Sequence, residues 1–455
     1  KAVPAVLLLS FLSTVPGSAV RLKPGQDKPK VSTADLWKLV EAADRDGLPR
    51  TAIEHLKEIV RLSLEEKREG EALRALTRRL VLESVVEGNK PGARVARIRE
   101  EIDQAPEGMK TMLRTILAQW YRHYFSRNRW RFAQRSATAG GIDEKDFTTW
   151  DLRRIVREID ALYQDILKDE ASLKRTPVSV YRDFLEPGDP PESLRPTMFD
   201  FVAFEALGFY VSGERAAAAP EDAFVLEADS PVLGPADEFI LYRPETTDED
   251  SPALRALRLY QSLLEFHRGD RDRDVFLDAD LHRLEAMRNL AAGESASARY
   301  LERLKEIAEK NPASAFSSLA DYLRARELKN QGDLVQAYAL ADRGRKAHPA
   351  SLGGRNCDAL ISDIASRDFD VRNERVVSPG TSSVLDVRYR NLTALHFRAV
   401  RDDFEARLAA ENAGDLFWPG DEPVRELLER EPAAAWSADL PATADFQARA
   451  ERVAA

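Results

Sequence analysis

The chain has 455 residues, of which 44% are hydrophobic and 32% charged, so it is long enough for two or more domains and is neither a disordered tail nor a fibrous repeat. Acidic residues outnumber basic ones by 77 to 67, and the net charge of −10, without any long run of Lys and Arg, argues against nucleic acid as a partner. One cysteine excludes an intrachain disulfide and cannot supply the thiolates of a zinc-finger or iron–sulfur set, and the six scattered histidines argue against a His-rich metal site.

The N-terminal segment has the features of a secretory signal peptide. Lys1 precedes an apolar run at residues 2–15, and small residues at Gly17 and Ala19 suit a cleavage site. The run is shorter than the roughly 20 residues that span a bilayer, and no other run approaches that length. We predict a signal peptide at residues 1–19, export to the periplasm or cell surface of a bacterium, and no membrane span after its removal. The alternative is a buried N-terminal helix.

A polar linker is predicted at residues 20–32, and a helical pattern begins after it. The clearest apolar stripe, at residues 113–124, repeats at helical spacing and includes Trp120, Tyr121 and Tyr124. Gly and Pro clusters separate this stripe from others along the chain. We therefore predict an α-helical, repeat-like domain over residues 33–366.

Because the first residue is Lys and not Met, we interpret the sequence as part of a longer protein.

A Pro-rich insertion interrupts the helical pattern near residues 177–252. This stretch holds 10 of the 24 prolines, but it is too rich in aromatic residues for a disordered segment. We expect an ordered loop packed over the helices, with one helix surviving around Phe199 and Leu207. The loop is expected to run through Pro220, Pro231 and the prolines that follow.

Residues 316–349 match the pattern of a tetratricopeptide-like helix pair. Gly332 marks the turn, Ala337 follows five residues later, and Pro349 ends the second helix. The pattern fails at Asp321, where an aromatic residue is expected, and at Gly344, where Ala is expected. We predict a divergent array of helical hairpins, and an irregular helical domain with one accidental match is the alternative.

Near residue 370 the period of the pattern changes to two. Leu385, Val387 and Tyr389 alternate with charged residues, and a similar run follows around Phe397. Helical stretches are expected at residues 402–413 and 424–430. A few strands cannot close a sandwich alone, so we predict that residues 370–455 are the N-terminal part of an incomplete β-sandwich domain.

Candidate chemistry is sparse. The aromatic cluster around Trp120 and Trp130 could stack on a ligand, but helix packing explains it more simply. The run at residues 268–274 lacks the Gly and Glu of a calcium loop, so we interpret it as a solvated turn. Asp278 and Asp280 are interpreted as favourable charges at a helix N-terminus. Cys357 has no His nearby and is predicted to be a buried structural thiol.

No Gly-rich phosphate loop, GxSxG or HExxH motif is present in the sequence. We therefore predict no catalytic, cofactor-binding or metal-binding residues and no enzyme activity. An exported helical enzyme that acts on glycans through its aromatic and acidic residues is the alternative.

The ordered set of segments resembles the N-terminal part of bacterial alpha-2-macroglobulin-like proteins, over nearly all of residues 33–455. Each motif alone is weak, and their order carries the resemblance. The motifs are Asn128-Arg129-Trp130-Arg131-Phe132, Arg135-Ser136-Ala137-Thr138, Thr149-Trp150-Asp151-Leu152, Leu194-Arg195-Pro196-Thr197-Met198-Phe199-Asp200-Phe201, Asp278-Ala279-Asp280-Leu281-His282-Arg283-Leu284, Val387-Arg388-Tyr389-Arg390-Asn391-Leu392 and Trp436-Ser437-Ala438-Asp439-Leu440-Pro441.

This resemblance implies an exported protease-trapping inhibitor whose partners are proteases, with residues 370–455 opening the first macroglobulin domain. Family members enclose a protease after it cuts a bait segment, and many carry a Cys-Gly-Glu-Gln thioester. Cys357 is followed by Asp358 and Ala359, so no thioester lies in this sequence. The helical part is expected to dock to an envelope protein or to the protein's own β-domains. The alternative is a tetratricopeptide-like scaffold protein of the bacterial envelope.

Overall fold

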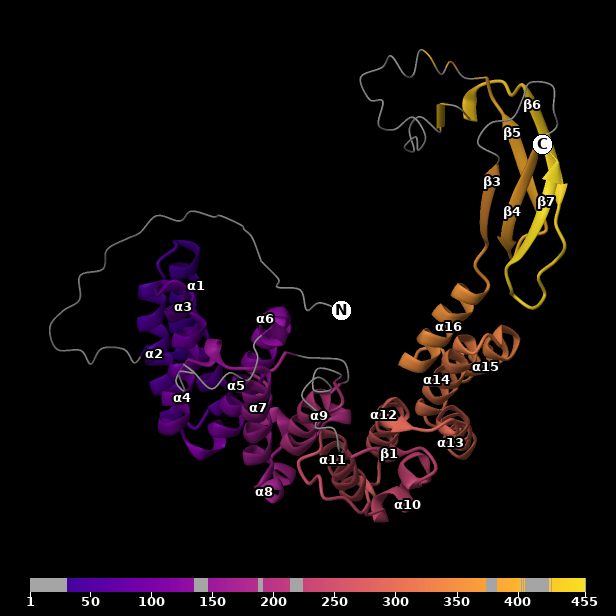
Figure 1. Cartoon of the computed structure of the whole chain (residues 1–455). Helices are drawn as coiled ribbons and strands as arrows, with labels where there is room; N and C mark the ends of the chain where they lie inside the picture. The colour runs from indigo at the N-terminus through magenta and orange to yellow at the C-terminus, as the bar shows by residue number, and fades with distance from the viewer. Residues whose placement is uncertain are drawn as a thin grey trace, which may run out of the picture. The chain divides into compact units, whose positions relative to one another are not determined.

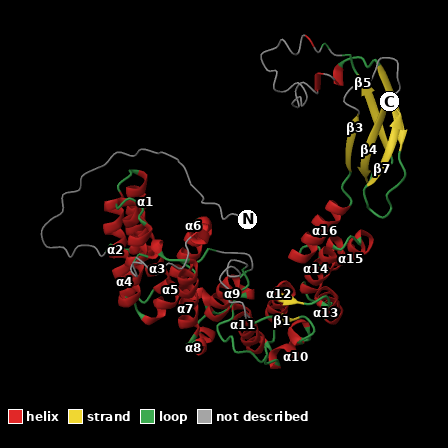
Figure 2. Cartoon of the chain, in the orientation of Figure 1, coloured by secondary structure: helices red, strands yellow, loops and turns green. Residues whose placement is uncertain are grey.

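The computed structural model describes residues 31–134, 146–186, 191–212, 224–373, 383–401 and 428–454, together with residues 403, 405, 425 and 426. These residues are mainly helical, with sixteen α-helices and a few short strands (Figures 1 and 2). The signal peptide and nearly all of the linker predicted from the sequence lie outside the described residues. None of the described helices is both long enough and apolar enough to cross a membrane.

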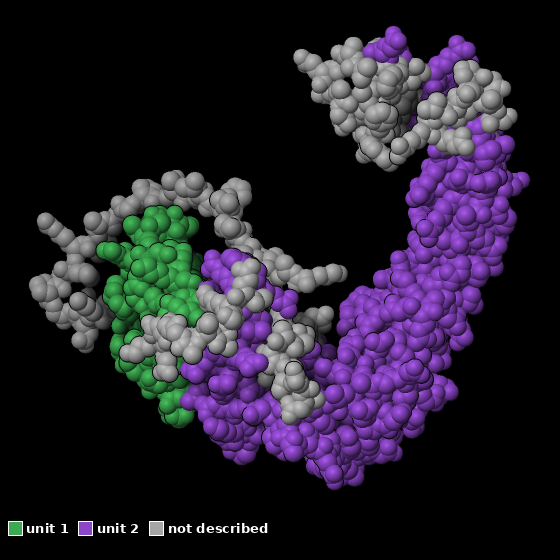
Figure 3. Space-filling model, viewed as in Figure 1, with its two compact units in different colours: residues 1–113, 141–149, 180–186 green, residues 114–140, 150–179, 187–455 purple. Residues whose placement is uncertain are grey.

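The chain divides into two compact units (Figure 3). Unit 1 comprises Lys1–Leu113, Gly141–Thr149 and Val180–Glu186, and unit 2 comprises Arg114–Gly140, Trp150–Ser179 and Pro187–Ala455. The predicted helical region is therefore not one compact body. Its boundary falls inside a helix, and a short segment near residue 180 returns to unit 1.

Unit 1 is built from helices that are joined by tight turns. They are α1 (Thr33–Arg45), α2 (Pro49–Glu65), α3 (Glu69–Val86), α4 (Pro91–Gln104) and the first part of α5 (Glu107–Arg127). The side chain of Ser32 accepts a hydrogen bond from the backbone N–H of Asp35 and so caps α1. Gly47 adopts a φ of +67° in the turn between α1 and α2, a conformation that glycine adopts without steric cost.

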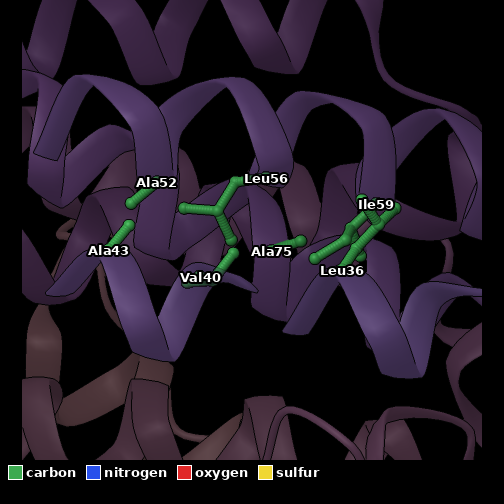
Figure 4. Packing of buried hydrophobic residues seen from close by; sticks show 7 residues of the cluster. All are labelled: Leu36, Val40, Ala43, Ala52, Leu56, Ile59 and Ala75. Atoms are coloured by element: carbon green, nitrogen blue, oxygen red, sulfur yellow. The ribbon is translucent and has the colours of Figure 1, made fainter. Parts of the chain in front are cut away.

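The core of unit 1 lies between its first three helices. Figure 4 shows the side chains of Leu36, Val40 and Ala43 from α1 against those of Ala52 and Leu56 from α2. The alanines on the facing sides let α1 and α2 approach closely. Ile59 and Ala75 complete this cluster.

A distant segment is built into unit 1. The hydroxyl of the buried Tyr181 donates a hydrogen bond to the carbonyl of Gly108, at the start of α5. A Cβ at Gly70, in the first turn of α3, would lie only 2.8 Å from the carbonyl oxygen of Val180. Glycine at this position therefore permits the returning segment to pass directly over α3.

Unit 2 contains the remaining helices and all of the described strands. Its helices are the rest of α5, α6 (Arg129–Gln134), α7 (Leu152–Leu167), α8 (Glu170–Arg175), α9 (Met198–Tyr210), α10 (Ala236–Leu241), α11 (Pro252–His267), α12 (Arg273–Leu290), α13 (Ala296–Lys310), α14 (Phe316–Asn330), α15 (Leu334–Ala347) and α16 (Leu352–Ile364). A parallel pair of two-residue strands, β1 (Leu226–Glu227) and β2 (Ala291–Ala292), joins the Pro-rich insertion to the end of α12.

The Pro-rich insertion is more helical than the sequence predicts. The helix expected near Phe199 is present as α9, but α10 and a 3-10 turn at Pro231–Leu233 replace the loop that was expected there. Proline fixes φ near the helical value and lacks an N–H that the first turn would leave unpaired, so Pro231 begins the 3-10 turn instead of preventing it. Pro235 occupies the N-cap position directly before α10. The part of the predicted loop around Pro220 lies outside the described residues.

The helix pair predicted at residues 316–349 is present as α14 and α15. Gly332 occupies the turn with a φ of +87°, and Ala325, Ala337 and Ala341 are buried between the helices. The two positions that break the repeat pattern lie together, because a Cβ at Gly344 would be 3.1 Å from the Cβ of Asp321. Asp321 is buried and forms an ion pair with Arg343.

The strand region forms two antiparallel sheets. One has the order β3 (Asp368–Asn373), β4 (Val384–Arg390) and β7 (Arg449–Ala454), and the other pairs β5 (Ala394–Ala399) with β6 (Ala434–Asp439). The alternation predicted in β4 is confirmed, since Leu385, Val387 and Tyr389 are buried. Consecutive strands β4 and β5 belong to different sheets, and one apolar cluster joins Val387 and Tyr389 to Phe397 and Trp436.

The helices expected after β5 can be compared with the structure only in part. Residues 425, 426, 428 and 429 are helical, in agreement with the second predicted stretch at residues 424–430. The first stretch, at residues 402–413, lies almost wholly outside the described residues.

Candidate functional site

Most of the candidate residues singled out in the sequence are part of the interior. Cys357 is buried among α14, α15 and α16, and its thiol lies 3.7 Å from the carbonyl oxygen of Ser318. Burial, and after it the negative charge of Asp321, raises the pKa of this thiol to about 12. A thiol that stays protonated at neutral pH is a poor nucleophile, which agrees with the structural role predicted for it.

The aromatic cluster of α5 and α6 divides into a buried part and an exposed part. Tyr121 is buried with its ring centroid 5.8 Å from that of Trp150, and Phe125 lies against Phe132 at 5.3 Å. These contacts are typical of aromatic packing in a core, as the helical stripe predicts. Trp130 lies outside this packing and is 60% exposed.

The acidic run at residues 268–274 forms the turn between α11 and α12, and its carboxylates are bonded to the protein. Asp272 caps α12 by accepting from the backbone N–H of Asp274, and Asp274 accepts from the hydroxyl of Ser314 at 2.6 Å. Asp270 contacts the ring of His267, so this carboxylate is not simply solvated. Among the described residues, no group of three or more His, Cys, Asp or Glu side chains is placed to hold a metal ion.

The interpretation of Asp278 and Asp280 as N-terminal helix charges is wrong. Both lie in the middle of α12, which begins earlier, at Arg273, and both are buried. Asp278 forms an ion pair with Arg195, whose guanidinium lies over the ring of Phe204. A buried charge is stable only when it is paired, and the sequence could not show a partner 83 residues away.

Asp280 is paired with a fully buried arginine. Arg283 donates to Asp280 from Nε at 2.9 Å and from a terminal nitrogen at 2.5 Å. Its remaining donors reach the carbonyls of Val232 at 2.8 Å and Gly234 at 3.1 Å, and its guanidinium lies over the ring of Phe239. This arginine therefore attaches the Pro-rich insertion to α12. The i, i+3 spacing of Asp280 and Arg283, in a segment whose apolar residues are not confined to one face, is the sequence signal for this pair.

A buried histidine joins α9 to the end of α11. His267 is 2% exposed, and its Nε2 lies 2.7 Å from Asp200 while its Nδ1 lies 2.7 Å from Asp270. Asp200 also accepts from the backbone N–H of Thr197 in the capping box of α9. With a carboxylate at each ring nitrogen, the form of the imidazole that satisfies both contacts is the cation, which donates twice.

The charge of His267 depends on two opposing effects. Burial by itself lowers the pKa of the imidazole, but hydrogen bonds and charge attraction from Asp200 and then Asp270 outweigh it, so the pKa is raised above its ordinary value. The pair of carboxylates therefore stabilises the folded state as long as the ring is protonated. The ring is too deeply buried to reach a substrate, and its role is to hold α9 against α11.

We expect the free energy of unfolding of unit 2 to decrease as the pH rises, because His267 then loses its proton. A histidine whose pKa is raised by folding stabilises the folded state fully below the pKa of the unfolded chain, about 6.5. This stabilisation is lost as the pH rises through the pKa of the folded state. Urea unfolding followed by circular dichroism between pH 6 and pH 9 checks this expectation. The variant His267→Gln should lose this part of the pH dependence, whereas His396→Gln, at an exposed ring on Ser437, should keep it. An unchanged profile in His267→Gln would contradict the assignment.

The junction between the helices and the strands is the candidate functional site, because it is where the two kinds of structure in unit 2 are fixed to each other. We define the junction as the C-terminal end of α16, the turn at Gly332 with Tyr338, and the loops around Asn391 and Phe446. Asn391 has a φ of 58° and donates from its side chain to the carbonyls of Ile364, at 2.8 Å, and Ser366, at 2.9 Å. An amide from the strand region therefore caps the last helix.

The second half of the junction is an aromatic contact. The ring of Phe446 stacks on that of Tyr338 in α15, with centroids 5.0 Å apart and planes inclined by 16°. Gln447 donates to the carbonyl of Gly332 at 2.7 Å. Thr443 accepts from the backbone N–H of Asn391 at 2.8 Å and so links the two loops to each other.

The fold and this junction define the molecule as a mainly helical protein that carries a small two-sheet strand region on its last helices. No family model matches the chain, and no curated protein matches it.

Proposed function

We propose that this chain is the N-terminal part of an exported alpha-2-macroglobulin-like protease-trapping inhibitor, in which the helical region serves as a docking platform for β-domains. The observation that carries the proposal is the junction, where α15 and α16 hold the strand region through Asn391, Phe446 and Gln447. A docking platform needs contacts that hold the β-domain in one defined orientation on the helices. The capped helix end and the stacked rings supply them.

The strand region supports the second part of the proposal. Two antiparallel sheets share one apolar cluster, an arrangement that fits a β-sandwich in residues 370–455. Protease trapping requires enclosure of the attacking enzyme and no nucleophile of the inhibitor's own. The buried and protonated Cys357 is compatible with such a mechanism, because it leaves any covalent step to other parts of the protein.

Trapping is tested on the natural gene product with a broad panel of endopeptidases. A trapped protease keeps an open active site but cannot reach large substrates, so we expect cleavage of a protein substrate to be lost while cleavage of a small chromogenic peptide persists. Equal loss of both activities would indicate an ordinary active-site inhibitor. Retention of both activities with every protease tested would contradict the proposal. N-terminal sequencing of the exported protein checks the signal peptide separately.

The second candidate is a tetratricopeptide-like scaffold protein of the bacterial envelope. The pair α14–α15, with Gly332 in its turn and Ala325 and Ala337 buried between its helices, favours it, because such pairs present broad surfaces to protein partners. The downstream reading frame separates the two candidates. Strand-patterned sequence on the order of a thousand residues, enough for several further domains, favours the inhibitor, and its absence favours the scaffold.

A further inference from the structure

The three-stranded sheet has two edges of different character. In the order β3-β4-β7, the outer strands β3 and β7 each pair with β4 alone among the described strands (Figure 1). The register places Arg449 and Glu451 of β7 opposite Tyr389 and Val387, on the face that carries the apolar cluster. Charged residues that point toward the apolar face discourage the addition of another strand, so the β7 edge is protected.

The edge formed by β3 has no such protection. Its register places Phe369 opposite Tyr389 and Val371 opposite Val387, so the apolar face continues from β4 onto β3. Tyr389 and Val387 are buried, whereas Phe369 is 58% and Val371 37% exposed. The sheet therefore ends in an apolar edge strand, which is the kind of surface that pairs with a further strand.

The charged face of the sheet indicates which strand fits there. Arg372, Asp386 and Arg452 form one row across the three strands, and Asp370 stands opposite Arg388 in the next row on this face. Charge therefore alternates across all three strands in the first row and between β3 and β4 in the second, where β7 carries Ala450. A strand added to β3 continues this alternation only if it places an acidic residue opposite Arg372 and a basic residue opposite Asp370.

The strand β3 meets this requirement itself. If two copies pair antiparallel with Val371 opposite Val371, Asp370 of each copy stands opposite Arg372 of the other. Phe369 then lies opposite Asn373 and diagonal to Val371 of the other copy, within reach of an aromatic side chain. The alternative register with Asp370 opposite Asp370 places two like charges together. The self-complementary register is therefore the favoured one.

We propose that β3 is a self-association edge, through which two copies of this chain join their sheets around a two-fold axis at Val371. The same patch then serves both copies, as in an isologous dimer. Main-chain hydrogen bonds along β3, the apolar contacts of Phe369 and Val371, and two Asp370–Arg372 pairs hold the interface. This inference does not rest on the proposed inhibitor function.

Sedimentation equilibrium of the full chain tests the proposal. We expect a concentration-dependent change from monomer to twice the monomer mass. Asp370→Arg should weaken the dimer about tenfold, because it places arginines opposite each other twice. Mixing Asp370→Arg with Arg372→Asp should give a heterodimer whose dissociation constant lies within about threefold of that of the natural chain, because the two basic residues of one copy then stand opposite the two acidic residues of the other.

Two valine variants serve as a matched pair. Val371→Lys introduces a charge on the apolar side of the edge and should abolish the dimer. Val384→Lys, at a valine that is 47% exposed and pairs with Ala454 of β7, should leave it unchanged. Circular dichroism confirms that each variant is folded. A chain that stays monomeric at every concentration, or a mixture that associates no better than Asp370→Arg alone, would overturn the proposal. A partner polypeptide, or a further strand of a longer natural protein, found on β3 in place of a second copy would do so too.

Discussion

Replacing Asp280 by alanine is expected to lower the free energy of unfolding of unit 2 by about 3–5 kcal/mol, because it leaves the guanidinium of Arg283 buried without its counter-charge. Arg283 is fully buried, and burial already lowers its pKa while Asp280 acts in the opposite direction. Native-state hydrogen exchange of the amides of α12 measures the change within the affected unit.

Two further variants make the cause testable. The double variant Asp280→Leu/Arg283→Met removes both charges and should recover about half of the loss, since the carbonyls of Val232 and Gly234 still lose their donor. Lys346→Ala, at an exposed ion pair with Asp342, should cost no more than about 0.5 kcal/mol. A cost below about 1 kcal/mol for Asp280→Ala would show that the pair is solvated in the folded protein.

The elements that could be predicted from the sequence are those whose pattern is set by neighbouring residues. The stripe at residues 113–124 gives α5 because each turn of a helix brings residues three and four apart to one face. The alternation of Leu385, Val387 and Tyr389 gives β4 for the same reason at a period of two. The turn at Gly332 was also predictable, because a positive φ is a local requirement.

The elements that could not be predicted depend on distant partners. Asp278 and Asp280 look like surface charges until Arg195 and Arg283 are placed beside them. Asp200 lies 67 residues from His267, so the buried ring between two carboxylates has no local signature. The pairing of β4 with β7 in place of β5 is likewise a property of the tertiary structure, since sequence proximity favours a hairpin.

The two departures from the repeat pattern lie side by side, and each has its own physical reason. At Gly344 the repeat expects Ala, yet a Cβ there would lie 2.8 Å from the sulfur of Cys357 and 3.1 Å from the Cβ of Asp321. The third helix α16, which carries Cys357, packs so close to α15 that only glycine fits. The departure at Gly344 therefore compensates for the thiol, and the polar Asp321 is accommodated by its pair with Arg343.

Gly344→Ala is therefore expected to destabilise the α14–α16 region by about 1–2 kcal/mol, although alanine is the residue that the repeat pattern favours. The clash with Cys357 costs about 1–3 kcal/mol, and the higher helix propensity of alanine offsets up to about 1 kcal/mol of it. Hydrogen exchange of the amides of α15 and α16 measures the loss. Gly269→Ala serves as the matched control, because no atom lies within 4 Å of its added Cβ, and it should change stability by less than about 0.5 kcal/mol.

The double variant Gly344→Ala/Cys357→Ala decides whether the thiol is the cause. Removing the sulfur opens the space that the new methyl group needs, so the two changes should be less harmful together than the sum of their separate effects, by about 1 kcal/mol. If the effects add within about 0.3 kcal/mol, the clash lies elsewhere, at the carbonyl of Ser318, 3.3 Å from the added Cβ. A favourable coupling would show that the thiol of Cys357 occupies the space that a side chain at position 344 would need, so that glycine is required there because of Cys357.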